Sequence, residues 1–179
     1  MIETFADNPT GRWRFFSDQV MGGVSSGALH FDHDDIRNWA RMTGMVSTEN
    51  NGGFIQMQRL LEAPLPPGLT GVLLTARGND QRYFIHLRRT GASAPTAFYR
   101  AGFDVKSEWC ETRLPFAVFT ASNARIPALL EGSNLASVGI VAYGRNHHAD
   151  ICVSEIGFYR ACRGKGRRAL RSQLSDMGS

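Results

Sequence analysis

The chain has 179 residues, of which 42% are hydrophobic and 20% are charged, proportions typical of soluble globular proteins. This length predicts one domain with a sizeable core, and no apolar run is long enough for a membrane-spanning helix. The N-terminal residues show no secretory signal, and the three cysteines are odd in number and form no C-x-x-C pair. These features argue against a disulfide framework and a structural zinc site, and they predict a reducing, cytoplasmic compartment.

The net charge of +4 is concentrated at the C-terminus. Residues 160–179 contain six basic residues and one acidic residue, a net charge of +5, which leaves −1 for residues 1–159. We therefore expect no specific nucleic-acid interface on the body of the protein. We predict a β domain over residues 1–162 and a basic, flexible tail over residues 163–179, suited to contact an acidic partner or a membrane surface.

Two glycine-centred segments lie near the start of the chain. Residues 17–27 read Ser-Asp-Gln-Val-Met-Gly-Gly-Val-Ser-Ser-Gly, and residues 49–54 read Glu-Asn-Asn-Gly-Gly-Phe. Adjacent glycines let the backbone turn sharply or lie close against another group. We interpret the two segments as parts of one shaped surface rather than as ordinary loops.

Short segments with strand character follow one another along the chain. In Tyr83–Arg88 the residues alternate, with Tyr83, Ile85 and Leu87 on one face, as a half-buried strand requires. The expected strands are residues 28–31, 36–42, 53–61, 69–77, 83–88, 98–105, 108–114, 137–143 and 150–160.

The turns between these strands suggest how they are connected. Turn residues at positions 78–81 predict an antiparallel hairpin over residues 69–89, and residues 98–105 and 108–114 are expected to form a second one. Helical candidates are confined to residues 116–122 and 170–174. About nine strands without an alternating β-α pattern predict an all-β fold, an antiparallel β-sandwich or jelly roll.

Three patterns resemble catalytic or metal sites. Residues 23–27 match the G-x-S-x-G nucleophile elbow, but a strand follows where that motif needs a helix. Loop carboxylates can bind calcium, so Asp32, Asp34 and Asp35 stay candidates for a calcium site. In residues 147–150, neighbouring side chains of an extended chain point to opposite sides and do not converge on a metal. Solvated turns are the preferred interpretation of both clusters. We therefore predict no catalytic residue, no metal site, no cofactor and no enzymatic activity.

The order of several blocks resembles the complex I intermediate-associated protein 30 family over about residues 5–160. Trp13 and residues 17–27 are similar to the family's opening block, and residues 49–54 are similar to its second block. Later blocks are echoed by residues 77–83, Trp109, 114–119, 137–140 and 156–159. The third block departs from the family pattern, because Gly78-Asn79-Asp80-Gln81 stands where the family usually has Gly-Asp-Gly.

The resemblance implies a galactose-binding-like β-sandwich in a bacterial member of a family of chaperone-like, non-catalytic assembly factors for respiratory NADH:ubiquinone oxidoreductase. We therefore expect a protein-interaction module whose partners include subunits of that complex. The candidate binding residues are Asp18, Met21, Gly22, Gly23, Ser25, Asn50, Asn51, Gly52, Gly53, Phe54, Arg59, Arg77, Asp80 and Arg88.

Two alternatives stay open at this stage. Each candidate binding residue, taken singly, has a turn-capping or core-packing role as its simplest explanation. A carbohydrate- or small-ligand-binding module is the alternative function, because exposed aromatic side chains on such a sandwich can bind sugar.

Overall fold

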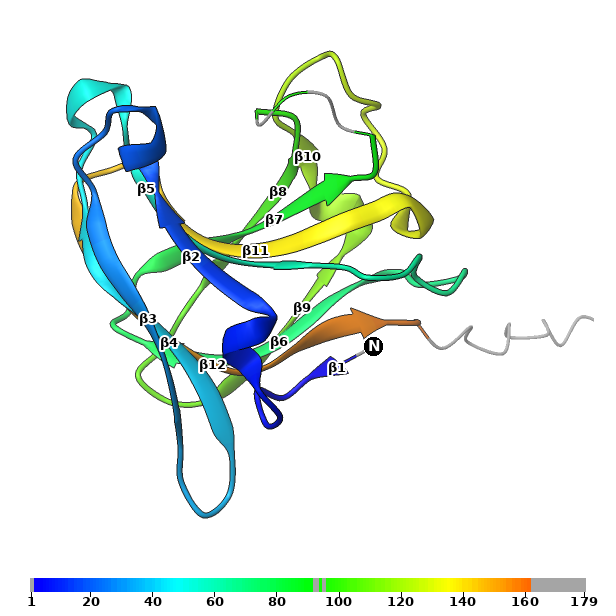
Figure 1. Cartoon of the computed structure of the whole chain (residues 1–179). Helices are drawn as coiled ribbons and strands as arrows, with labels where there is room; N and C mark the ends of the chain where they lie inside the picture. The colour runs from blue at the N-terminus through cyan, green and yellow to red at the C-terminus, as the bar shows by residue number, and fades with distance from the viewer. Residues whose placement is uncertain (1, 92–93, 95, 162–179) are drawn as a thin grey trace, which may run out of the picture.

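The computed structural model describes residues 2–91, 94 and 96–161, which form two antiparallel sheets packed face to face (Figure 1). Sheet A contains β1 (Ile2–Glu3), β3 (Ser26–His33), β4 (Asn38–Val46), β6 (Gly71–Gly78), β9 (Cys110–Pro115) and β12 (His147–Tyr159). Sheet B contains β2 (Trp13–Ser17), β5 (Phe54–Leu60), β7 (Arg82–Arg89), β8 (Tyr99–Asp104), β10 (Thr120–Ala121) and β11 (Leu135–Tyr143). The predicted all-β antiparallel sandwich is confirmed.

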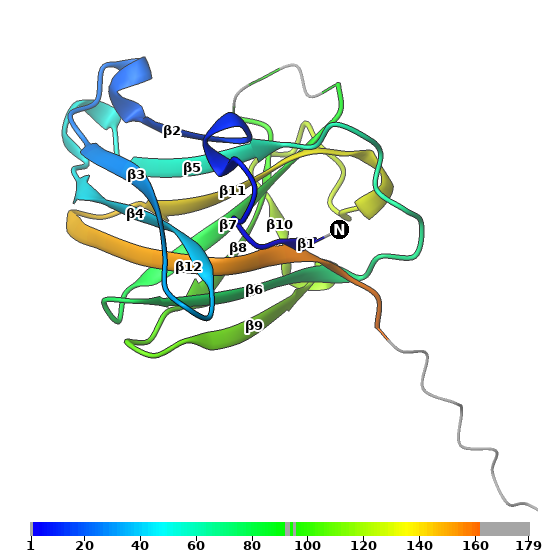
Figure 2. The same cartoon turned by 60° about the horizontal axis from the view of Figure 1, so that its bottom comes forward.

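The strand order shows how the chain crosses between the sheets. Sheet A runs β3-β4-β12-β6-β9, with β1 paired to β12, and sheet B runs β10-β8-β7-β11-β5-β2. The long strand β12 pairs with β4 through its first half and with β6 through its second half. Figure 2 shows the N-terminal strand β1 beside β12, on the side of the molecule where the described chain ends.

Both predicted hairpins are wrong. β6 pairs with β12 and β9, whereas the next strand, β7, pairs with β11 and β8 in the other sheet. Their turn bridges the sandwich, because Asn79 N donates to Asp150 O in sheet A and Gln81 O accepts from Val105 N at the end of β8. The strands of the second predicted hairpin, β8 and β9, also lie in different sheets. In each pair both strands contribute apolar residues to the core between the sheets, so they lie on opposite sides of the core and do not pair edge to edge.

The helical expectations are met only in part. Residues 116–122 contain a single 3-10 turn, η4 (Phe116–Val118), which only Phe119 separates from β10. Further 3-10 turns are η1 (Pro9–Gly11), η2 (Asp18–Met21), η3 (Glu49–Asn51) and η5 (Gly132–Asn134). The expected helix at residues 170–174 and the basic tail at 163–179 lie outside the described residues. In the part of the chain that the structure describes, no helix is long and apolar enough to cross a membrane.

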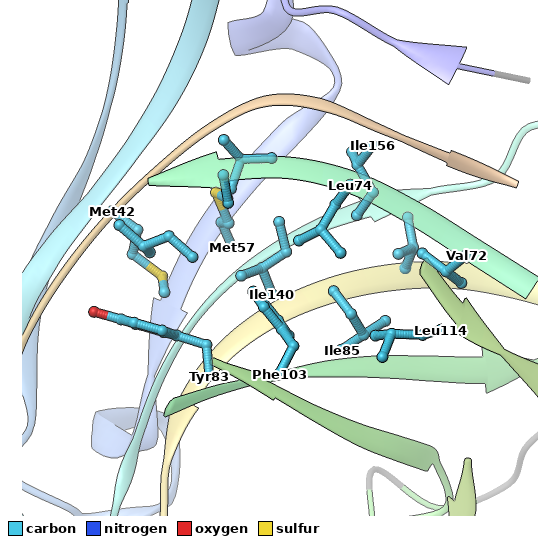
Figure 3. Packing of buried hydrophobic residues seen from close by; sticks show 14 of the residues in the cluster. Met42, Met57, Val72, Leu74, Tyr83, Ile85, Phe103, Leu114, Ile140 and Ile156 are labelled. Carbon is cyan, nitrogen blue, oxygen red and sulfur yellow. The ribbon is translucent and has the colours of Figure 1, made fainter. Parts of the chain in front are cut away.

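The core fills the space between the two sheets, as Figure 3 shows. Met57, Ile85 and Ile140 project into it from sheet B, and Leu74 and Ile156 meet them from sheet A. All five side chains are buried. Because alternate residues of each strand fill this core, the residues between them are placed on the outer faces of the sheets.

Candidate functional site

A buried carboxylate joins the two glycine-centred segments. Asp18 follows β2, and its side chain is fully buried. The carboxylate accepts hydrogen bonds from Ser25 N at 2.9 Å, Ser25 Oγ at 2.5 Å, Gly53 N at 2.5 Å and Phe54 N at 3.3 Å. Asp18 therefore ties the loop between β2 and β3 to the start of β5.

Hydrogen bonding keeps this carboxylate ionised. Burial by itself would raise the pKa of Asp18, but the hydrogen bonds from Ser25, Gly53 and Phe54 outweigh it and lower the pKa below its ordinary value. A carboxylate that accepts several backbone N–H groups is stabilised in its charged form. The segment is thus a fixed structural clamp at neutral pH.

The adjacent glycines make room for this clamp. A Cβ on Gly23 would lie 2.3 Å from the Asp18 carboxyl carbon, and one on Gly52 would lie 2.4 Å from a carboxylate oxygen. Gly22 and Gly53 have left-handed φ values of 87° and 128°, which favour glycine. Each Gly-Gly pair therefore supplies one residue that turns the chain and one that gives Asp18 space.

The G-x-S-x-G match has a structural explanation. Ser25 is fully buried, its hydroxyl donates to Asp18, and it accepts a hydrogen bond from Ser47 N at 3.0 Å. The strand β3 follows directly, as the sequence indicated. Ser25 thus connects neighbouring loops and is not presented to solvent as a nucleophile would be.

Apolar side chains project from the loop that Asp18 holds. We call Val20, Met21 and Val24 the loop tip; Val20 is 72% exposed, Met21 is 61% exposed, and Val24 is also exposed. The loop tip lies at the upper left of Figure 1, next to the turn formed by η3. In that turn Asn50 and Asn51 are exposed and have left-handed φ values. The structure therefore brings the predicted loop residues to one end of the sandwich.

A second surface lies on the outer face of sheet B, where aromatic rings line neighbouring strands. Phe16 and Phe54 contact edge to face at 6.2 Å between centroids, and so do Phe84 and Tyr143 at 6.0 Å. Phe98, just before β8, stacks on His86 of β7 at 4.1 Å. Rings from β2, β5, β7 and β11 therefore share this face with the ring that precedes β8.

Two polar side chains are buried among these rings although they point away from the core. Gln56 is 2% exposed and His86 is 5% exposed. The Nε2 atoms of both side chains have no hydrogen-bond partner among the described residues. Burial, followed by the positive charges of Arg88 and Arg100, lowers the pKa of His86 to about 3, so its ring is neutral.

The neutral His86 ring predicts a loss of stability in mild acid. Because folding lowers the pKa of His86 from 6.5, its stabilising contribution is complete above pH 6.5 and falls as the pH drops toward 3. Between pH 7 and pH 5 we expect the free energy of unfolding to fall by about 2 kcal/mol from this group.

Urea unfolding at the two pH values measures this loss, with His86→Phe as the matched variant, because phenylalanine keeps a ring against Phe98. His147, whose pKa burial also lowers, is present in both proteins, so the difference between them isolates His86. Equal pH dependence of the unfolding free energy in the two proteins would contradict a lowered pKa for His86.

The other predicted residues lie apart from the loops. Arg59 is at the far end of β5 and pairs with Glu3, whereas Arg77 stacks on Trp39 and Trp109 outside sheet A. Asp80 lies in the turn between β6 and β7 with a left-handed φ of 55°. Arg88 lies over the Phe98 ring, on the outer face of sheet B. The structure therefore separates these four residues from the loop residues.

Of the two candidate metal clusters, the first lies at the turn between β3 and β4. The interpretation of residues 147–150 as a solvated turn is wrong, because they begin β12 and pair with β4. Asp34 accepts hydrogen bonds from Ile36 N and Arg37 N, both at 2.8 Å, and so caps the turn between β3 and β4. Asp150 pairs with Arg41 on the neighbouring strand. Within residues 2–91, 94 and 96–161, no three His, Cys, Asp or Glu side chains gather closely enough to hold a metal ion.

Comparison with known proteins gives the family. The family model described as complex I intermediate-associated protein 30 (CIA30) matches residues 4–151. The chain belongs to the CIA30 family. No curated protein sequence matches it.

Solved structures of similar fold include carbohydrate-binding modules. One is a family 11 module from Clostridium thermocellum, with a TM-score of 0.68 and 14% identity over 84% of this chain and 89% of the module. Another is a family 30 module, with a TM-score of 0.55 and 11% identity over 76% of this chain and 92% of the module. These likenesses confirm the galactose-binding-like sandwich; at such identities they show the fold alone.

The region matched to CIA30 contains both surfaces described above. It begins at the residue after Glu3, includes the Asp18 clamp and the outer face of sheet B, and ends within β12. The sequence singled out Asp18 and the paired glycines as candidate binding residues, but not the contact between them. It did not single out Gln56, Tyr143 or Arg100 as site residues of the outer face. For His86 the available signal was the alternation of β7, which placed it opposite the core-facing residues.

Proposed function

We propose that this CIA30-family protein is a non-catalytic docking module that binds a protein partner through the loop tip. The proposed partner class is a subunit of respiratory complex I, and the proposed role is chaperone-like assembly. The supporting observation is that apolar side chains project into solvent from a loop anchored by a buried carboxylate. Solvent-exposed apolar groups that are held together are typical of interaction sites.

Physical considerations favour docking at this place. Covering a side chain of the size of valine or methionine contributes about 1.5–3 kcal/mol. Because Asp18 already holds the loop backbone, little conformational freedom remains to be lost on binding. A partner that covers Val20 and Met21 therefore gains most of the free energy of their burial.

The test removes the apolar surface without touching the clamp. The double variant Val20→Ser, Met21→Ser should weaken partner binding tenfold or more, since about 1.4 kcal/mol corresponds to a factor of ten. Affinity purification of the tagged full chain, with the copurified subunits quantified and complex I followed on native gels, measures the effect.

The matched control is Ile36→Ser, because Ile36 is equally apolar and exposed but lies in the turn between β3 and β4. This variant should bind like the wild type. If the double variant recovers the same partners in the same amounts, the loop tip is not the docking site.

A second candidate function is carbohydrate or small-ligand binding on the outer face of sheet B. The observation that favours it is the row of rings on this face, among them Phe54, Phe84 and Tyr143. Aromatic rings offer flat apolar faces, and unpaired polar atoms beside them can supply hydrogen bonds. A glycan array on which the protein binds nothing would remove this candidate.

A further inference from the structure

The outer face of sheet B has a polar centre built across three strands. In the strand register Gly139 of β11 lies opposite Gln58 of β5 on one side and opposite His86 of β7 on the other. Gln56 leans over the same glycine, because a Cβ on Gly139 would lie 2.4 Å from Gln56 Nε2. The absence of a side chain at Gly139 therefore leaves room for the Gln56 amide between β5 and β7.

Among residues 2–91, 94 and 96–161, the Nε2 atoms of Gln56 and His86 find no hydrogen-bond partner. A buried donor or acceptor without a partner costs about 1–3 kcal/mol, so such groups are uncommon unless something else completes them. Neighbouring Gln58 shows the contrast, since its Nε2 donates to Ser137 Oγ at 2.8 Å. Gln56 and His86 are thus the positions on this face where an external polar group would gain most, and it reaches their buried Nε2 atoms when the side chains above them move.

Aromatic contacts hold His86 in place. Its ring stacks on Phe98 with an interplanar angle of 17°, and Tyr143 meets it nearly edge to face at 6.2 Å. Tyr143 itself is 37% exposed, so part of its ring is open to solvent. The site therefore combines a buried polar centre with a partly exposed aromatic ring beside it.

The charge around this centre is positive. Arg88 lies over the Phe98 ring at 5.4 Å, and Arg100 lies over the Tyr143 ring at 5.9 Å. Both guanidinium groups are near enough to disfavour a charge on His86. Among the outward-facing residues of the strands of sheet B, the acidic residue is Asp104, and its carboxylate pairs with Arg82. The centre is therefore suited to an anionic group.

We propose that the outer face of sheet B binds an acidic oligosaccharide, with Gln56 and His86 hydrogen-bonded to sugar oxygens and Arg88 and Arg100 facing a uronate carboxylate. Tyr143 contacts a sugar ring. A guanidinium fork matches a carboxylate in geometry, and hydroxyl-rich rings supply both the hydrogen-bonding groups and the apolar faces that this site can use. The inference rests on the second candidate function and is independent of docking at the loop tip.

The test compares sugars that differ in charge but share their linkage. Calorimetric titration of the full chain uses hexamers of galacturonate and β-1,4-glucuronate, with methyl-esterified galacturonate and cellohexaose as their respective neutral counterparts. We expect at least one uronate to bind tenfold or more tightly than its neutral counterpart, and to bind more weakly as sodium chloride is raised.

Three variants locate the site. Gln56→Leu, His86→Phe and Arg100→Gln should each weaken uronate binding tenfold or more. The matched control is Arg113→Gln on the outer face of sheet A, which should leave binding unchanged. Arg100 is only half-buried, so Arg100→Gln tests the location of the site if Gln56→Leu or His86→Phe fails to fold.

Each other outcome overturns a specific part of the proposal. Neutral and acidic sugars bound equally would overturn the acidic ligand while leaving carbohydrate binding in place, and no binding of any sugar would overturn both. Uronate binding unaffected by the three variants would overturn the location. Tighter binding of polyglutamate or of a nucleotide, lost in the same variants, would overturn the ligand class. None of these outcomes depends on Val20 or Met21, so a failure of sugar binding is distinguished from a failure of docking at the loop tip.

Discussion

Replacing Asp18 by alanine is expected to lower the free energy of unfolding by about 3–5 kcal/mol, because several buried donors lose their acceptor and each such loss costs about 1–3 kcal/mol. The substitution leaves Ser25 N, Gly53 N, Phe54 N and the Ser25 hydroxyl without their common acceptor. It also opens a space beside Gly23 and Gly52. Urea denaturation at pH 7, fitted with a shared slope, measures the loss.

Two comparisons make this result specific. Asp18→Asn keeps the size of the side chain but turns an NH₂ group toward backbone donors, so we expect it to be destabilised as well. Asp35→Ala, an exposed residue between β3 and β4, should change stability by no more than about 0.5 kcal/mol. An Asp18→Ala protein within 1 kcal/mol of the wild type, a margin of about one net hydrogen bond, would show that water replaces the carboxylate without cost.

The lowered pKa of Asp18 also predicts that the protein loses stability in acid. Because folding lowers the pKa of Asp18 from 3.8, its contribution is complete above pH 4 and is lost as the pH falls through the folded value. Glu3 and Asp150 also have lowered pKa values and contribute in the same range. The difference between wild type and Asp18→Asn therefore isolates the part that belongs to Asp18.

The sequence identified most strands correctly but not their partners. Alternation in β7 predicts which side chains face the core, because a period of two is a property of one strand alone. It does not predict which strand pairs with β7, because strands of both sheets present an apolar face to the core and show the same alternation. The hairpin expected at residues 69–89 failed for this reason: its turn residues fit a connection between sheets as well as one within a sheet.

The two surfaces differed in how far the sequence revealed them. The paired glycines signalled a close approach of the backbone, but the group that they approach, Asp18, lies 35 residues from Gly53 and has no local signature. On the outer face, Gln56 and His86 look like ordinary solvent-facing positions in their own strands. His86 is covered by Tyr143 and Phe98, and Gln56 lies between Phe16 of β2 and Val141 of β11; only the sheet order brings these neighbours beside them.

A second large effect is expected at the opposite end of the sandwich, where Glu3 links the sheets. Glu3 belongs to β1 of sheet A, and its buried carboxylate accepts hydrogen bonds from Trp13 Nε1 at 3.2 Å and from Arg59 of sheet B. Phe5 N and Arg12 complete its partners. Glu3→Ala should cost about 3–5 kcal/mol, because Arg59 is left largely buried without a counter-charge.

The double variant Glu3→Leu, Arg59→Met separates the loss of an ion pair from the loss of packing. Replacing both members of a buried ion pair by apolar side chains is often neutral, whereas removing one member leaves an uncompensated charge. We therefore expect the double variant to be more stable than the sum of the two single changes predicts, with a coupling of about 1–3 kcal/mol. Urea unfolding of the four proteins in the cycle measures it. If the two losses simply add, Glu3 stabilises the sandwich through Trp13 and Phe5 rather than through the charge of Arg59.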